Sequence, residues 1–194
     1  MRPDPLAAAL FLTAAFILAG VAQAAWLRTS LSWRLMMPLD GGRRFRGRRV
    51  FGDNKTVRGF VVIVPATAVA FVVLSAAIGR WNADALASLW PLSLRGFAAV
   101  GALAGFGFMA GELPNSFVKR QFDIAPGRAP RGELAATICF IADRVDSILG
   151  MLIVLSVAVP VPATTWLYVL LIGPGIHFAF SGLLYRLGVK ARAA

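Results

Sequence analysis

The chain has 194 residues, of which 58% are hydrophobic and 15% are charged, with a mean hydropathy of +0.73. These proportions exclude a soluble globular domain, because the chain lacks the residues for a polar coat. Its 20 Lys and Arg outnumber 9 Asp and Glu and lie between apolar blocks, so we expect anionic lipid and phosphorylated partners and no nucleic acid.

Five apolar blocks are predicted to cross a membrane, in chain order residues 6–27, 59–79, 96–111, 134–159 and 164–185. The first forms about 33 Å of helix, enough for a hydrocarbon layer of ~30 Å. We interpret it as an uncleaved span and not as a signal peptide. The fourth is unusual because it contains Asp143, Arg144 and Asp146, and residues 134–142 have the alternative of a helix on the membrane surface. The expected fold is one all-α membrane domain over residues 1–194.

The loops between the blocks are unevenly basic. Residues 28–58, 114–132 and 186–194 contain sixteen Lys and Arg, whereas the other side of the membrane has three. Because basic loops stay in the cytoplasm, we expect the N-terminus outside and the C-terminus inside, as an odd number of spans requires. The sequence thus predicts a multi-pass protein of the cell (inner) membrane with an active site facing the cytoplasm.

A motif bounded by glycines, residues 52–59, leads into the second apolar block. Its candidate phosphate-binding side chains are Asn54, Lys55, Thr56 and Arg58. Basic and hydroxyl side chains donate hydrogen bonds to phosphate oxygens, and the start of the following helix is expected to add free N–H groups and the positive end of a helix dipole. The spacing differs from a Walker A loop. The alternative is a basic loop that binds lipid head groups.

The second motif, residues 111–120, gathers a carboxylate and two cations. Glu112, Ser116 and Lys119 are four and three residues apart, which places them on one helical face, with Arg120 close beside it. The alternative is an ordinary ladder of ion pairs on the protein surface.

The third motif holds Asp143 and Asp146, whose carboxylates project from one side of a helix. Carboxylates inside a membrane are costly and indicate a functional site. Two like charges this close repel unless a cation lies between them, and Arg144 points elsewhere on the helical wheel. Oxygen ligands beside phosphate-binding cations suit Mg²⁺. The alternative is a structural ion pair at a helix end.

Together the motifs supply carboxylates for Mg²⁺, cations for phosphates and a membrane that delivers a lipid. Phosphoryl-type transfer needs mainly charge neutralisation and in-line positioning. The pattern is consistent with attack by a lipid phosphomonoester on a nucleoside triphosphate. A phosphate oxygen is already an anionic nucleophile, so no dedicated base is required.

These motifs resemble the lipid cytidylyltransferases, most closely the CDP-archaeol synthase branch and more widely phosphatidate cytidylyltransferase. The likeness covers most of the chain and rests on the five-span layout and on residues 38–42, 52–59, 111–120 and 143–146. The wider family's Ser-x-x-Lys-Arg and Asp-Arg-x-Asp signature is present as Ser116, Lys119, Arg120, Asp143, Arg144 and Asp146.

The resemblance implies a nucleotidyltransferase that uses CTP and Mg²⁺ and forms a CDP-activated lipid for phospholipid biosynthesis. It implies Glu112, Asp143 and Asp146 as metal ligands, with catalytic roles for Lys119 and the two aspartates. The phosphate-contacting set that it implies is Lys55, Ser116, Lys119 and Arg120. The Asp-Arg-Val-Asp form is closer to the phosphatidate enzymes, so the lipid tail stays open between archaeal ether chains and acyl chains.

Two other functions remain compatible with the sequence. A small transporter would use the intramembrane carboxylates as a relay, and it predicts inverted repeats and broken helices. A scaffold without catalytic activity would bind anionic lipid through its basic loops, and it predicts that only the number of loop charges matters. Any of the three functions is compatible with a homo-oligomer.

Overall fold

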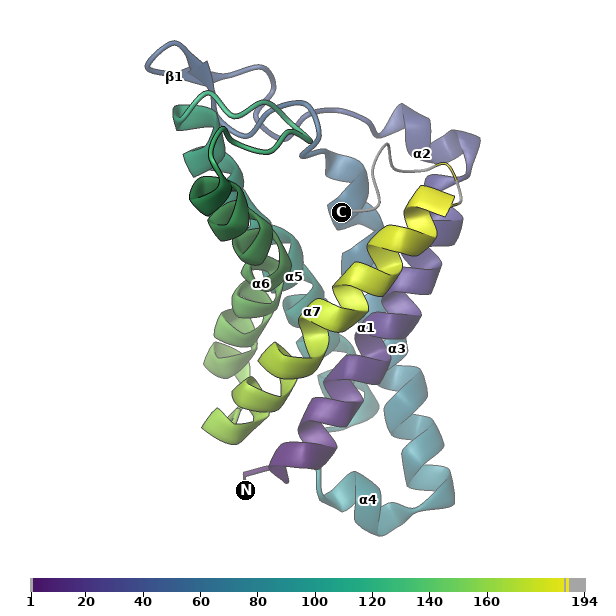
Figure 1. The fold of residues 1–194 in the computed structure, drawn as a ribbon. Helices are drawn as coiled ribbons and strands as arrows, with labels where there is room; N and C mark the ends of the chain where they lie inside the picture. Colours follow the sequence, from purple (N-terminus) through teal and green to yellow (C-terminus); the bar gives the residue numbers. More distant parts are fainter. Residues whose placement is uncertain (1, 187, 189–194) are drawn as a thin grey trace.

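The computed structural model describes residues 2–186 and 188, and this part of the chain contains five long helices and two short ones (Figure 1). The long helices are α1 (Pro5–Leu27), α3 (Val57–Trp81), α5 (Leu94–Gln121), α6 (Glu133–Ala158) and α7 (Ala163–Arg186). The short helices are α2 (Ser30–Arg34) and α4 (Ala83–Ala87), and a hairpin pairs β1 (Arg44–Phe45) with β2 (Arg48–Arg49). The predicted all-α membrane architecture is therefore confirmed.

Four of the long helices, α1, α3, α5 and α7, are long and apolar enough to cross a membrane. Helix α6 has 26 residues and is long enough, but the charged residues Asp143, Arg144 and Asp146 interrupt its apolar stretch, so it is not one of these four. Residues 134–142 continue into the rest of α6 without a break, so they are not a separate surface helix. Five spans and the sides on which the termini lie remain predictions, and most of the basic C-terminal segment lies outside the described residues.

Helix α5 is longer than the sequence predicts. The expected block ended at residue 111, but the helix runs to Gln121 with Pro114 inside it. Proline is tolerated inside long membrane helices because neighbouring groups satisfy the backbone atoms that it frees. The extra turns carry Asn115 and Lys119 beyond the apolar block, on the same helix as Glu112.

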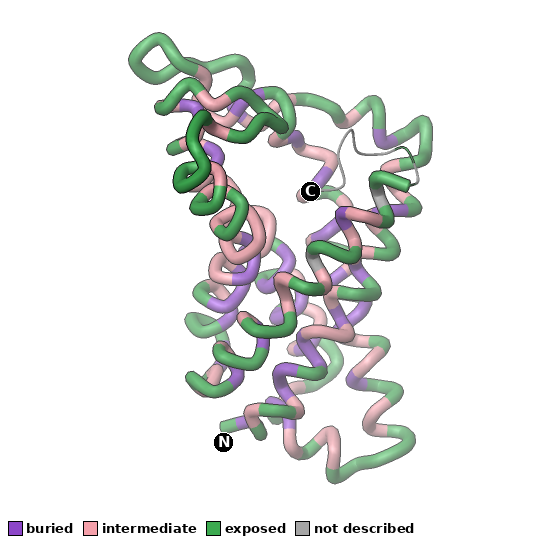
Figure 2. The backbone as a smooth tube through the Cα atoms, in the orientation of Figure 1, coloured by how far each residue is buried: buried purple, intermediate pink, exposed green. Residues whose placement is uncertain are grey.

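The molecule is packed tightly at the end away from the hairpin. There the ring of Phe11 on α1 meets Phe71 on α3 edge to face, with 5.0 Å between ring centroids, and also contacts Phe97 and Trp90. The indole N–H of Trp90 donates a hydrogen bond of 2.9 Å to the carbonyl of Pro160. Buried residues follow the inner sides of the helices, and exposed residues cover the hairpin and its neighbouring loops (Figure 2).

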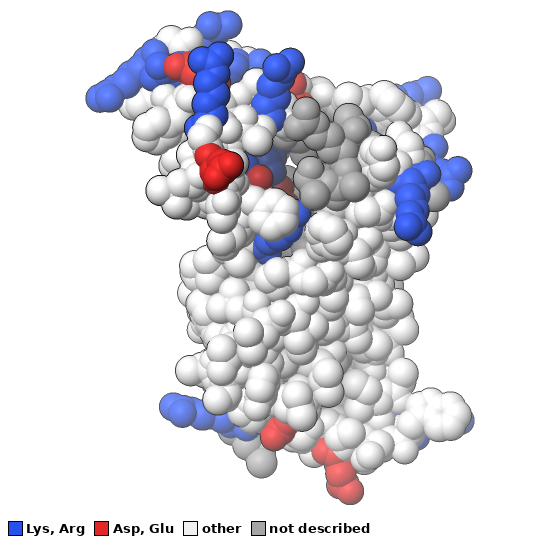
Figure 3. All heavy atoms as spheres, viewed as in Figure 1, with Lys and Arg blue, Asp and Glu red and all other residues white. Residues whose placement is uncertain are grey.

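Helices α6 and α7 form a V. They touch where Gly173 of α7 lies against the side chain of Ile148 of α6, and they diverge towards the hairpin end (Figure 1). On the face in Figure 3, basic side chains gather at that end, uncharged atoms form a broad belt below it, and a recess at the basic end contains carboxylate atoms. The aromatic packing and the basic recess thus lie at opposite ends of the fold.

Candidate functional site

Charged and polar residues of α5, α6 and the loop before α3 meet near the basic end in one group, which we call the carboxylate cluster. Its members are Lys55, Glu112, Asn115, Lys119, Asp143, Asp146 and Ser147. The α5 members are three and four residues apart, so they share one face of that helix and look towards α6. The structure therefore brings together residues from all three predicted motifs.

Asn115 lies between the two aspartates. Its amide nitrogen donates to Asp143 Oδ1 at 2.6 Å and to Asp146 Oδ2 at 2.7 Å, so the two carboxylates converge on one atom. Lys119 forms a salt bridge with Asp143. The shared amide, together with the lysine that neutralises Asp143, lets the two carboxylates lie this close without strong repulsion.

Glu112 is held from two sides. Its carboxylate forms a salt bridge with Lys55, and Ser147 Oγ donates to Glu112 Oε1 at 2.9 Å. The side chains of Lys55 and Glu112 are only 19% and 21% exposed, so water screens this pair less than it would a surface pair. Ser147 Oγ also lies 3.2 Å from Asp146 Oδ1, which links Glu112 to the aspartate pair.

Two glycines allow α5 and α6 to come this close. A Cβ atom at Gly111 would lie 2.4 Å from the carbonyl oxygen of Asp146, and one at Gly150 would lie 2.4 Å from the Cα of Gly111. Any side chain at these positions would force the two helices apart. The contact therefore sets the separation between Glu112 and Asp146.

The fit of a divalent ion is partial. The oxygen donors of the cluster suit Mg²⁺, and Asp143 and Asp146 converge on an amide nitrogen, a position that also suits a cation. Among the described residues, however, no three His, Cys, Asp or Glu side chains are arranged to hold a metal ion. Glu112 is engaged by Lys55 and Ser147, so the predicted set of three carboxylates is not assembled in this arrangement.

Asp40 organises the loop that presents Lys55. Its carboxylate accepts hydrogen bonds from three backbone amides, those of Gly42, Phe51 and Gly52, and a bidentate pair of bonds from Arg49. Burial by itself raises the pKa of Asp40, but these hydrogen bonds outweigh it and hold the pKa well below its usual range. Asp40 was not predicted as a site residue, although an aspartate before two glycines is a turn signal.

The N–H groups at the start of α3 are not free, and this prediction was wrong. The amide of Val57 donates to the carbonyl of Met37, and that of Arg58 donates to the carbonyl of Leu35. The segment after α2 folds back and uses these donors, which only the tertiary structure shows. Of the other predicted residues in this motif, Asn54 is exposed and Thr56 is buried as the N-cap of α3.

Arg120 and Ser116 are buried, and neither takes part in the hydrogen bonds that join the members of the cluster. The guanidinium of Arg120 donates to the carbonyl of Ile124, and its side chain lies against Gly52. Its Nε is buried and has no hydrogen-bond partner among the described residues. Arg120 therefore packs against the loop, with one buried donor that has no partner in the described part of the chain.

Asn115 and Ser147 were missed by the sequence analysis. Asn115 lies within the second motif and Ser147 directly follows the third, but neither is charged, and neither signals a contact with a carboxylate on another helix. Their role depends on the crossing of α5 and α6 at Gly111 and Gly150, for which the sequence offers only the glycines themselves.

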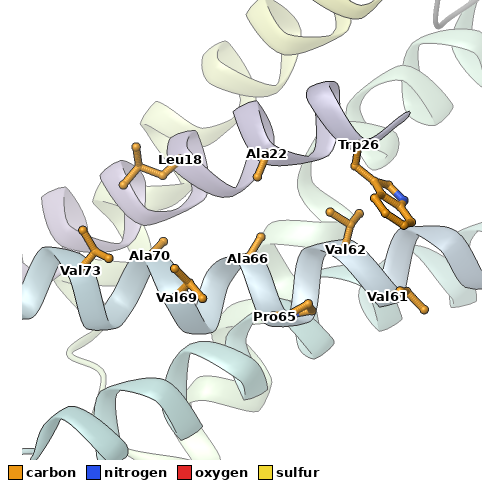
Figure 4. A pocket seen from close by; sticks show the side chains of 10 residues that line it. All are labelled: Leu18, Ala22, Trp26, Val61, Val62, Pro65, Ala66, Val69, Ala70 and Val73. Carbon is orange, nitrogen blue, oxygen red and sulfur yellow. The ribbon is translucent and has the colours of Figure 1, made fainter. Parts of the chain in front are cut away.

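A separate groove of about 480 Å³ lies between α1 and α3 (Figure 4). It runs from Trp26 and Val61, near the basic end, to Leu18 and Val73, and aliphatic side chains line most of it. The groove has no charged residue among its lining, so it suits hydrocarbon and not a phosphate.

Comparison with known proteins gives concordant matches. A family profile described as CarS-like CDP-archaeol synthase matches residues 30–193. The CDP-archaeol synthase of Halobacterium salinarum is 36% identical over 159 residues, which cover 79% of this chain and 81% of the relative. That of Methanoculleus marisnigri is 35% identical over 162 residues, with 79% and 87% covered.

One solved structure has a similar fold. It is described as an intramembrane enzyme for archaeal membrane lipids biosynthesis, and it matches with a TM-score of 0.59 at 23% identity. The match covers 92% of this chain and 94% of the other, so the whole helical arrangement is shared.

Proposed function

The chain belongs to the CDP-archaeol synthase family, and from this premise we propose that it transfers the CMP unit of CTP to a lipid phosphate. Members of this family are nucleotidyltransferases, and the reaction is CTP-dependent cytidylyl transfer to an archaeal type of lipid phosphate. In the proposed step, an oxygen of the lipid phosphate forms a bond to the α-phosphorus of CTP. The bond from that phosphorus to the β-phosphate breaks, and pyrophosphate leaves.

The observation that carries this proposal is the convergence of Asp143 and Asp146 on Asn115, with a lysine at each end of the cluster. Lys55 and Lys119 balance carboxylates in this arrangement and would turn to phosphate oxygens when a nucleotide binds. The buried donor of Arg120 lies beneath the same loop. In-line transfer needs this density of cations around the reacting phosphates.

Mg²⁺ is proposed as the cofactor, held by Asp143 and Asp146, with Glu112 joining once it leaves Lys55. A bound divalent ion would neutralise charge on the α-phosphate and on the departing pyrophosphate. The chain's own lysines orient the triphosphate, and the lipid approaches sideways from the inner leaflet. We place the cluster on the cytoplasmic side of the cell membrane, where CTP is available.

The first test measures transfer of labelled CMP from CTP to a lipid phosphate by the purified protein in detergent. Asp143→Asn and Asp146→Asn keep the shape of the side chains but remove the charges, so each should lower kcat by at least about 100-fold, an effect in the range measured for lost electrostatic stabilisation. Asp84→Asn, on α4 at the far end of the molecule, is the matched loss of one negative charge and should keep full activity. Full activity in both aspartate variants contradicts the site.

The same assay separates the other two functions. A transporter would move an ion or solute without consuming CTP, and a scaffold would tolerate Lys55→Arg because the loop charge is unchanged. Assays with an archaeal ether lipid phosphate and with phosphatidate side by side identify the preferred tail.

A further inference from the structure

Arg144 of α6 follows Asp143 of the carboxylate cluster in sequence but has no role in the chemistry described so far. We propose that Arg144 binds the phosphate of the lipid substrate as the lipid enters between α6 and α7. This inference rests on the proposed function and names the residue through which its lipid is recognised.

Arg144 lies at the mouth of the V between α6 and α7. The two helices touch at Ile148 and Gly173. One turn nearer the basic end on each helix come Arg144 and Phe178, with the guanidinium carbon 5.8 Å from the centre of the Phe178 ring. Towards the hairpin end α6 and α7 diverge (Figure 1). A lipid that entered between the two helices would bring its phosphate within reach of Arg144.

The surroundings of Arg144 keep its charge available. Its guanidinium stacks on the ring of Phe140, 3.2 Å from the ring centre, and one nitrogen donates to the Phe140 carbonyl at 2.8 Å. Within the described part of the chain it forms no salt bridge with a carboxylate. A guanidinium has five N–H donors, so several remain for a second, bidentate partner.

This distinguishes Arg144 from the other cations near the carboxylates. Lys55 and Lys119 are each paired with a carboxylate, and Arg120 is buried under the loop. Asp143 is the neighbour of Arg144 in sequence, but its carboxylate faces Lys119 and Asn115. Arg144 is thus a half-buried cation held by a carbonyl and aromatic rings, and its charge is not cancelled by a salt bridge.

The proposed reaction creates a demand for such a cation. Three carboxylates and a triphosphate would repel an incoming phosphomonoester, and a positive group beside its path offsets that repulsion. The rings of Phe140 and Phe178 are 46% and 53% exposed, so they offer apolar surface to the first carbons of the lipid while Arg144 holds its phosphate. The groove between α1 and α3 has no charged lining residue and is suited only to a tail.

Arg144 acts by hydrogen bonding and charge, without transferring a proton. Two of its N–H groups would hold two oxygens of the lipid phosphate, and the third oxygen would attack the α-phosphorus while pyrophosphate leaves. The residue should therefore determine affinity for the lipid phosphate and have little effect on affinity for CTP.

The test compares the Michaelis constants of full-length Arg144→Gln and wild type in lipid nanodiscs. Loss of a charge-assisted, bidentate contact should raise KM for the lipid phosphate about 10- to 100-fold, while KM for CTP changes less than about 2-fold. Arg144→Lys should recover part of the loss, since a lysine keeps the charge but not the fork. Arg128→Gln removes one exposed basic charge on the same side and should leave both constants unchanged. An unchanged KM for the lipid, or an equal rise in both constants, overturns the proposal.

A binding measurement tests the role of Arg144 independently of whether the protein transfers CMP. A fluorescent short-chain lipid phosphomonoester and its uncharged diglyceride counterpart are titrated into wild type and Arg144→Gln without CTP. Wild type should bind the phosphorylated probe more tightly, and the variant should lose that preference. If this loss occurs in a protein without transferase activity, the proposed function fails and Arg144 stands. If transfer is active and the preference survives in Arg144→Gln, only the Arg144 proposal fails.

Discussion

Lys55 and Glu112 show how the site holds charge in the absence of a ligand. Each lysine of the carboxylate cluster neutralises one acid, and Asn115 and Ser147 bridge the remaining oxygens. A bound nucleotide would bring phosphates for the lysines and a divalent ion for the acids. Substrate binding would thus exchange the two internal ion pairs for external ones, and the divalent ion would supply the cation that Asp146 lacks.

This exchange predicts the effect of removing one partner. Lys55→Met leaves Glu112 as a largely buried carboxylate without its cation, and we expect a loss of about 1–3 kcal/mol in the free energy of unfolding. The double variant Lys55→Met with Glu112→Gln should recover most of that stability, because no charge is left unpaired. Both variants should bind CTP weakly. Thermal unfolding in detergent and CTP titration measure the two effects.

The opposite pattern would show that the pair has another role. A double variant as unstable as Lys55→Met would mean that Lys55 stabilises the loop through contacts other than Glu112. Wild-type CTP affinity in either variant would remove Lys55 from the proposed phosphate-binding set.

At the scale of single residues, the sequence predicted the charged members of the cluster better than the uncharged residues that bridge them. Glu112, Lys119, Asp143 and Asp146 were expected on helical faces from their spacing, and the structure brings them together. Asn115 was not predicted as a site residue, because an uncharged amide bridges two carboxylates only when another helix places them beside it. Contacts across helices depend on tertiary packing, which spacing along one helix does not encode.

Among the elements, the crossing of α5 and α6 sets the geometry of the cluster. Gly111 of α5 and Gly150 of α6 lie in backbone contact, and Gly107 extends the contact by one turn. The next turn of α5 towards the basic end carries Asn115, and the preceding turn of α6 carries Asp146. A small change in helix separation would therefore be passed directly to the shared hydrogen bonds of Asn115.

Gly150→Ala tests this dependence. Its methyl group would lie 2.4 Å from the Gly107 carbonyl oxygen and from the Gly111 Cα, so the helices must separate. We expect a loss of about 1–3 kcal/mol in stability from overpacking, together with a larger fractional loss of transfer activity than of stability. Unfolding temperature and the transfer assay on the same preparation check this.

Gly182→Ala on α7 is the matched control, because nothing lies within 4 Å of a methyl group there. It should leave activity unchanged and add up to about 1 kcal/mol of stability through helix propensity. Normal activity in Gly150→Ala would show that the cluster tolerates a wider separation of α5 and α6.

The sequence predicted these elements unevenly. Apolar blocks gave all five long helices, because a run of uncharged residues is a direct consequence of a hydrocarbon environment. The apolar block ended at residue 111 but α5 continues to Gln121, because Pro114 and the charged residues after it end the apolar run without ending the helix. The free helix start at α3 was wrong because the segment around Leu35 and Met37 returns to pair with it, a contact between distant residues.

On the scale of the whole molecule, packing and charge are distributed in opposite directions. The aromatic contacts of Phe11, Phe71, Phe97 and Trp90 close one end, while the hairpin end is basic and carries the recess seen in Figure 3. In the proposed reaction, the lipid head group and the nucleotide both bind at this basic end. This asymmetry has a function only if the basic end faces the compartment that contains CTP.

The orientation is tested with single cysteines. Cys139 is half-buried and is first replaced by serine. Ala83→Cys then places a thiol at α4, on the closed end, and Ala125→Cys places one in the loop between α5 and α6, on the basic end; both alanines are exposed. Because sixteen Lys and Arg are expected to hold the basic end in the cytoplasm, a membrane-impermeant maleimide should label Ala83→Cys in intact cells and Ala125→Cys only after permeabilisation. Labelling of both variants in detergent shows that each thiol is reactive. The reverse pattern in intact cells would place the carboxylate cluster outside, away from CTP, and would contradict both the orientation and the proposed reaction.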